Sequence, residues 1–166
     1  MREINWRNIA SFQRAIGRFV LSWADLELRL DLLALTIRLI ESPDQRASAL
    51  PHQLKDKLRY VRGKVEALEA LQEHRTGIIE ILDQIKDLSD TRHDFVHGAA
   101  IEYHTGSSTT VTLARLLQPS IGPRRKPTKV TVGQVNATSD RVRSLGGNLL
   151  DFAETINRTN QAPMKH

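Results

Sequence analysis

The residues whose types and spacing suit chemistry stand together at positions 91–98, which read Thr-Arg-His-Asp-Phe-Val-His-Gly. Arg92 falls in a mainly apolar row of a helical pattern, so its guanidinium is expected on the buried side of the helix. Burying a guanidinium is costly unless it pairs with a carboxylate or meets an anion such as phosphate. His97 follows five positions later and supplies an imidazole that can move protons near neutral pH. The segment therefore combines an anion-binding group with an acid–base group.

A structural interpretation of the same residues stays open. Arg92 could form an ion pair with Glu27 or Asp90, which would satisfy its charge without any ligand. His97 could donate a hydrogen bond to the last carbonyls of the helix, where a cation is favoured. In that case the segment would stabilise the fold and perform no reaction.

A metal site is a third interpretation. His93 and His97 are four positions apart, a spacing that lets two imidazoles on one helix face the same ion. No third ligand is evident, because His74 and His104 have no motif relation to this pair. We therefore expect no metal and no cofactor.

The elements that must position these residues follow from the apolar spacing. Apolar residues recur every three or four positions from Ile9 to Ile40, which predicts one helix that ends near Glu41. A second apolar row predicts that the C-terminal half of this helix is buried from two sides; the row consists of Val20, Ala24, Leu28, Leu32, Leu35 and Leu39. Further helices are expected over about 51–71 and from about Glu73 to the glycine at 98, where glycine accepts a left-handed cap.

Beyond this glycine the period changes to alternation, which predicts a hairpin with strands over 99–104 and 109–117 and a third short strand near 128–130. Thr131 and Gln134 resemble a capping box that opens a last helix. Gly146 and Gly147 lie inside that helix, where only close packing or a kink would justify them.

The predicted fold is therefore mainly α: an up-and-down bundle of four main helices with a small β-hairpin or sheet inserted before the last helix. A single domain is expected over residues 1–158. Within it, 99–132 would be the hairpin and basic-loop insertion, and 159–166 would be a frayed tail.

Composition excludes several classes of protein. With 166 residues, 40% hydrophobic and 26% charged, the chain fits one folded soluble domain. It has no cysteine, which excludes disulfides, thiolate metal sites and cysteine nucleophiles. No Gly-rich phosphate loop or Gly-x-Ser-x-Gly elbow occurs. The polar start MREINWRN predicts no signal peptide, and five charged residues within 19–40 argue against a membrane span, so we expect a cytoplasmic protein.

Positive charge is concentrated in the C-terminal part of the chain. The net charge is +5, yet residues 1–98 hold 15 Lys/Arg and 15 Asp/Glu, whereas residues 99–166 hold nine against four. Arg124, Arg125 and Lys126 stand between two prolines, which keep the segment extended and its charges in water. This cluster is either a solvated loop or a phosphate contact.

The Arg92-His93-Asp94-Phe95-Val96-His97 run resembles the signature of HEPN (higher eukaryotes and prokaryotes nucleotide-binding) domains. That signature is an Arg, a polar residue, a few variable residues and a His, late in a helical bundle. The His-Gly ending, the hairpin after it, one more helix and the Trp23-Ala24-Asp25-Leu26-Glu27 run of the first helix are similar to a group of uncharacterised bacterial members. The resemblance covers roughly the whole chain in outline.

The resemblance implies roles for individual residues. Arg92 and His97 match the pair that, in active members, lines a cleft between two protomers and cleaves RNA without a metal. His93 matches the variable polar position, and His93 and Asp94 would shape the site, Asp94 on its RNA-binding side. Many members use an acidic residue on an earlier helix to orient the pair, and Glu27 is our candidate for it.

The chemistry of this pair suits RNA cleavage. His97 could take a proton from a ribose 2′-hydroxyl or return one to the leaving 5′-oxygen, while Arg92 stabilises the charge on the phosphate oxygens. The products would be a 2′,3′-cyclic phosphate and a 5′-hydroxyl. Residues five apart on an ideal helix point about 140° apart, so the two side chains converge only if the helix loosens near Gly98.

The function expected from this resemblance is a metal-independent endoribonuclease that acts as a homodimer in a toxin, stress or phage-defence role. Its partners would be RNA and a regulator such as an antitoxin or a nucleotidyltransferase. Arg124, Arg125 and Lys126 would guide the RNA backbone through charge. The alternative is a catalytically silent homodimeric interaction or RNA-binding module with the same helical fold.

Overall fold

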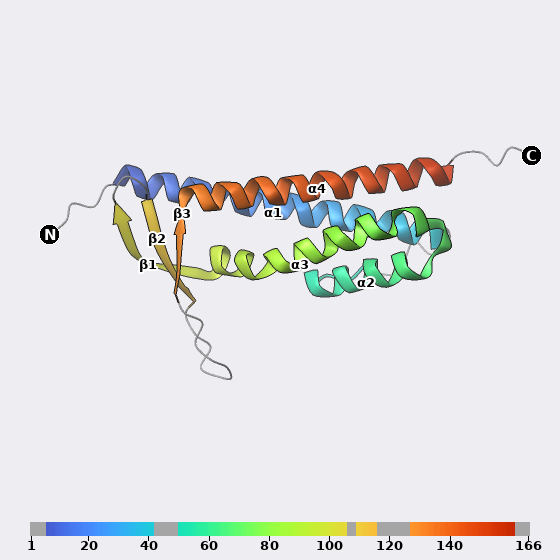
Figure 1. The fold of residues 1–166 in the computed structure, drawn as a ribbon, viewed down its shortest axis with the longest axis horizontal. Helices are drawn as coiled ribbons and strands as arrows, with labels where there is room; N and C mark the ends of the chain where they lie inside the picture. Colours follow the sequence, from blue (N-terminus) through green and yellow to red (C-terminus); the bar gives the residue numbers. More distant parts are fainter. Residues whose placement is uncertain (1–5, 42–49, 106–108, 116–126, 162–166) are drawn as a thin grey trace, which may run out of the picture. The chain divides into compact units, whose positions relative to one another are not determined.

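The fold is mainly α-helical, with one small sheet between the third and fourth α-helices, as predicted (Figure 1). The computed structural model describes residues 6–41, 50–105, 109–115 and 127–161. The elements in chain order are α1 (Trp6–Glu41), α2 (Leu54–Ala67), the 3₁₀-helix η1 (Glu69–His74), α3 (Arg75–His97), β1 (Gly98–Thr105), β2 (Thr109–Arg115), β3 (Thr128–Thr131) and α4 (Val132–Gln161). In these ranges no helix is long and apolar enough to cross a membrane.

Contacts between residues divide the chain into two compact units. Unit 1 consists of Met1–Trp23 and Leu88–Val142, and unit 2 of Ala24–Asp87 and Arg143–His166. Helices α1, α3 and α4 each contribute a segment to both units. The single domain expected over residues 1–158 stays a prediction, and the two units are described separately below.

The first apolar stripe of α1 is buried, as its spacing predicts. Phe12, Phe19 and Trp23 are buried in unit 1, and in unit 2 the stripe continues through Leu26, Leu30, Leu33 and Ile37. Side chains three and four positions apart share one face of a helix, so this regular spacing supplies buried side chains along nearly the whole length of α1.

The second apolar row of α1 is exposed, and the expectation that it is buried was wrong. In unit 2, Leu28 is 59% exposed, and Leu32, Leu35 and Leu39 are 40%, 44% and 43% exposed. The row lies on a different side of the helix from the buried stripe, so packing against the stripe does not cover it. A line of leucines therefore stays on the surface of unit 2.

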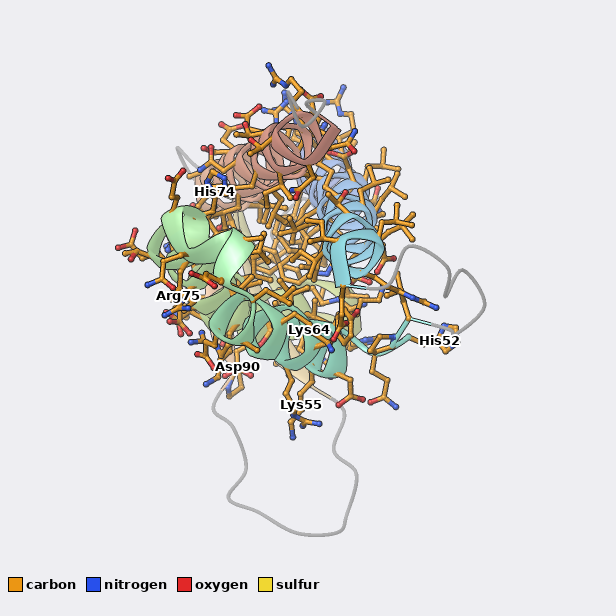
Figure 2. The ribbon with its side chains drawn as sticks, turned by 90° about the vertical axis from the view of Figure 1, so that its right-hand side faces the viewer. His52, Lys55, Lys64, His74, Arg75 and Asp90 are labelled. Carbon is orange, nitrogen blue, oxygen red and sulfur yellow. The ribbon has the colours of Figure 1, made fainter. Side chains whose placement is uncertain are left out.

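In unit 2, the second helix ends earlier than predicted. The expected range was 51–71, but α2 stops at Ala67 and Leu68 has an extended backbone before η1. The guanidinium of Arg75, labelled in Figure 2, donates to the carbonyls of Val65 and Glu66 at 3.4 and 3.0 Å. Carbonyls in the last turn of a helix have no N–H partner within that helix, so the Arg75 guanidinium supplies the hydrogen bonds that these two carbonyls need.

Ion pairs link the helices of unit 2. Lys57 on α2 has a side chain that is only 10% exposed, and its Nζ lies 2.7 Å from the Asp31 carboxylate on α1. The ammonium of Lys64, labelled in Figure 2, pairs with Glu41 at the end of α1. The basic side chains of α2 are therefore largely neutralised within the unit.

In unit 1, three antiparallel strands form a sheet of order β1-β2-β3, which confirms the hairpin and the third strand (Figure 1). The register shifts between Ala100 and Glu102, so Ile101 is an extra residue in β1. Val111 and Leu113 on β2 and Val130 on β3 are buried. The expected turn at 106–108 and residues 116–126 lie outside the described part of the chain.

Helix α4 begins with the predicted capping box. The Gln134 N–H donates to Thr131 Oγ1 at 3.1 Å, and the Thr131 N–H donates to Gln134 Oε1 at 2.8 Å. In unit 2, a Cβ at Gly146 would lie 3.2 Å from Arg29 Cδ on α1, so close packing explains this glycine, whereas Gly147 has nothing within 4 Å. The helix reaches Gln161, so residues 159–161 are helical and were wrongly expected in the frayed tail; residues 162–166 lie outside the described ranges.

Gly98 joins α3 directly to β1 in unit 1. A Cβ at this position would lie 2.3 Å from the Asp94 carbonyl oxygen and 3.2 Å from Leu113 Cβ. The helix stops after His97, as predicted. Gly98 does not have the expected left-handed backbone, so the close approach is the reason for a glycine at this position. The last turn of α3 and the start of the sheet are therefore in tight contact.

We expect Gly98→Ala to lower the free energy of unfolding by about 1–3 kcal/mol, because the new methyl group must displace backbone. Gly63→Ala is the matched control: Gly63 lies inside α2 with nothing within 4 Å, so alanine there should stabilise by about 0.5–1 kcal/mol. Urea unfolding of both variants measures the difference. Equal stability of Gly98→Ala and the wild type would contradict the close approach.

Candidate functional site

The residues of the Arg-x4-His motif lie on the last turns of α3, in unit 1. The helix stays α-helical through His97 and ends there, so it does not loosen before Gly98. At 100° per residue, Arg92 and His97 therefore leave the helix about 140° apart. The convergence of this pair that we considered within one chain does not occur.

The structure brings His93 and His97 together instead. Their ring centroids are 4.9 Å apart and the ring planes meet at 62°, an edge-to-face contact between exposed side chains. The spacing of four places them one helical turn apart on the same face. An accessible pair of imidazoles thus stands at the carboxyl end of α3.

Arg92 is half-buried and lacks a partner for its inner nitrogen. Its Nε is buried without a hydrogen bond, and no side-chain hydrogen bond or ion pair of Arg92 is found among the described residues. Its row runs from buried Ile78 to exposed Val96, so burial on this side of the helix decreases toward the end of α3. The ion pair of the structural interpretation is therefore not formed here.

The remaining predicted site residues have separate positions. Asp94 is half-buried on α3, and its backbone carbonyl is the group that approaches Gly98. Glu27 lies half-buried on the α1 segment of unit 2, so the structure does not assign it to the Arg92 site. Arg124, Arg125 and Lys126 lie outside the described residues.

The metal interpretation gains no third ligand from the structure. Among the described residues, no three His, Cys, Asp or Glu side chains lie close enough together to hold a metal ion. The described part of the chain therefore adds no third ligand to the His93 and His97 imidazoles.

A groove that the sequence analysis missed lies between α1 and the start of α4 in unit 1. It has a volume of about 420 Å³ and is lined by Ser11, Arg14, Ala15, Arg18, Val132 and Asn136. A signal was present in the sequence, because residues 6–23 contain three arginines and no acidic residue. Counting charge over 1–98 as a whole concealed this local excess.

A second groove, of about 410 Å³, lies in unit 2 and differs in charge. Glu80 and Asp151 line it, together with His74 and Phe152, whose rings are 5.8 Å apart, and no lysine or arginine does. Figure 2 labels His74 on this unit. The linings of the two grooves therefore differ in charge.

A comparison of the chain with protein-family models, with curated proteins and with solved structures found no match. The HEPN resemblance therefore rests on the residues of the motif and on the order of the helices. It stays a prediction.

A stability measurement can test whether the buried Nε of Arg92 lacks a hydrogen-bond partner. Arg92→Met keeps the length of the side chain and removes a buried donor that has no acceptor, so we expect the free energy of unfolding to stay constant or rise by up to about 1 kcal/mol. Lys57→Met is the matched control, because it leaves Asp31 without its partner and should cost about 1–2 kcal/mol. Thermal and urea unfolding measure both variants. A loss for Arg92→Met as large as the control's would show a structural ion pair.

Proposed function

We propose that the protein is a metal-independent endoribonuclease of the HEPN type that acts as a homodimer. The observation that carries the proposal is the half-buried Arg92 guanidinium, whose buried Nε has no partner, on the same helix end as two accessible imidazoles. A guanidinium in this state can be satisfied by an anion, and a phosphate group accepts two of its N–H groups at once.

The residues divide the chemistry as follows. His97 removes the 2′-hydroxyl proton or protonates the leaving 5′-oxygen, and Arg92 binds the phosphate and stabilises its developing charge. His93 contacts His97 and restricts the orientation of its ring. The attacking 2′-oxygen displaces the 5′-oxygen, which leaves a 2′,3′-cyclic phosphate and a 5′-hydroxyl.

A second copy belongs to the proposal for a geometric reason. Within one helix the side chains of Arg92 and His97 point about 140° apart, so one phosphate is hard to reach from both. A two-fold interface would place Arg92 of one copy near His97 of the other and create two equivalent sites. A cytoplasmic toxin, stress or phage-defence role and control by an antitoxin or a nucleotidyltransferase extend this proposal.

The decisive experiment is cleavage of end-labelled RNA in excess EDTA by the wild type, His97→Ala and Arg92→Ala. We expect each substitution to lower the cleavage rate by 100-fold or more, since a general acid–base group contributes about 10²–10⁴-fold. His52→Ala is the control, because His52 is an exposed imidazole just before α2 in unit 2 and should keep the wild-type rate. Resistance of the 3′ ends to a phosphatase that spares cyclic phosphates identifies the products.

Two results would overturn the nuclease proposal. One is no cleavage of any RNA by the folded, dimeric wild type. The other is cleavage that survives both substitutions, which would mean that the activity lies elsewhere or comes from a contaminant. Cleavage that EDTA abolishes would instead favour the metal interpretation, in which His93 and His97 bind a metal ion.

The exposed leucines of α1 favour a second candidate function, a dimeric interaction module without catalysis. Leu28, Leu32, Leu35 and Leu39 are spaced by four, three and four, the alternation of a coiled-coil seam. The flanking charges are satisfied internally, since Arg29 pairs with Asp25 at 2.9 Å and Asp31 with Lys57 at 2.7 Å. The occupant that fits best is a second copy, because such a stripe is complementary to itself across a two-fold axis.

Leu32→Gln with Leu35→Gln should convert the dimer to a monomer, because each copy would have to desolvate two amides in an apolar seam. Light scattering after gel filtration measures the mass. Ile101→Gln is the matched control, since Ile101 is 57% exposed on β1 of unit 1 and is not part of the leucine row, so its substitution should leave the mass unchanged. A dimer that persists in the double variant would exclude this surface. A monomeric variant that still cleaves RNA would show that cleavage does not need this dimer.

A further inference from the structure

The groove of unit 1 is a feature that the proposed role of the motif on α3 does not use. Its one wall is α1, which contributes Ser11, Arg14 and Arg18, and its other wall is the first part of α4, which contributes Val132 and Asn136. Arg14 and Arg18 are four positions apart, so both guanidiniums stand on one side of α1. The groove's volume of about 420 Å³ lies in the range of small-ligand sites, which is about 300–1,000 Å³.

The lining of the groove carries positive charge. Its described residues supply two guanidiniums, a hydroxyl and an amide, and no carboxylate. No acidic residue occurs over 6–23, and the first turn of α4 has none either. An anion in the groove would therefore meet hydrogen-bond donors without like-charge repulsion from its lining.

Neither arginine has a carboxylate partner among the described residues. Within them, Arg14 donates to its own helix, to the Ala10 carbonyl and to Ser11 Oγ, both at 3.3 Å. No hydrogen bond or ion pair of Arg18 is found in the described part of the chain. In unit 2, by contrast, Arg29, Arg59 and Arg62 each pair with an aspartate. The free charge of the groove is thus a local property and not a general feature of the protein's arginines.

We infer that this groove binds the phosphodiester backbone of a single-stranded nucleic acid. Guanidiniums present two parallel N–H donors that match phosphate oxygens. The lining has no aromatic side chain on which a base could stack, so the contact reads the backbone and not the sequence. The groove is an anchor for the strand, separate from the residues proposed to cut it.

This inference goes beyond the proposed nuclease and does not depend on it. A strand can be held by Arg14 and Arg18 whether or not His97 cleaves it. A 2′-deoxy strand separates the two questions, because it lacks the hydroxyl that must attack the phosphate and so reports binding alone.

The test is fluorescence anisotropy of the full chain with a labelled single-stranded 2′-deoxy oligonucleotide at salt concentrations between about 50 and 200 mM. Each neutralised phosphate of a single strand contributes about 0.7 to the slope of log affinity against log salt. Arg14→Gln with Arg18→Gln should therefore weaken binding and reduce the slope by about 1.4, the value for two contacts. Glutamine keeps the helix propensity, and circular dichroism verifies the fold.

The matched control is Arg59→Gln with Arg158→Gln, which removes the same charge from two arginines that are paired with Asp56 and Glu154 in unit 2. We expect the slope of this variant to equal that of the wild type. Three outcomes would overturn the inference: no binding by the wild type, an unchanged slope in the folded Arg14/Arg18 variant, or an equal fall in the control. Loss of slope in the Arg14/Arg18 variant alone supports it, even where no RNA is cleaved.

Discussion

The rest of the structure depends on one constraint, the burial of an apolar stripe on α1 that repeats every three or four residues. In unit 1 this stripe places Phe19 against Phe95 of α3, with ring centroids 4.9 Å apart in an edge-to-face contact. The last turns of α3, which carry Arg92 and His97, are anchored by that contact. In unit 2 the same stripe supplies Leu30, Leu33 and Ile37, all fully buried. A helix of 36 residues owes most of its stability to such burial and not to its intrinsic propensity.

Sequence predicted those parts of the fold that local rules determine. The long first helix, the hairpin, the third strand and the Thr131–Gln134 capping box follow from period and from short-range hydrogen bonding, and all are present. The errors concern tertiary surroundings. Periodicity shows that Leu28 to Leu39 form a row but cannot show whether another element covers it. It also cannot show that Arg75 takes the carbonyls at the end of α2, which stops that helix before the predicted residue.

The candidate site was predictable in position and not in geometry. Spacing alone placed His93 beside His97, because four residues are about one helical turn. That Arg92 has no partner is a property of all the side chains around it, which the sequence does not order in space. The count of charges has the same limit. It is balanced over 1–98, yet among the described residues four cations of α2 pair with carboxylates, whereas Arg14 and Arg18 do not. Which charges are unpaired therefore depends on the positions of the side chains and not on the net charge of a segment.

The direct junction at Gly98 has a mechanical consequence. No loop separates His97 from β1, and the backbone of Asp94 lies too close to residue 98 to leave slack between them. A displacement of the first residues of β1 would therefore also displace the last turn of α3, which carries the imidazole pair. β1 is an edge strand of its sheet, so one side of its backbone is open to an added strand. The imidazole pair at the end of α3 is therefore joined, without an intervening loop, to a strand at the edge of the sheet.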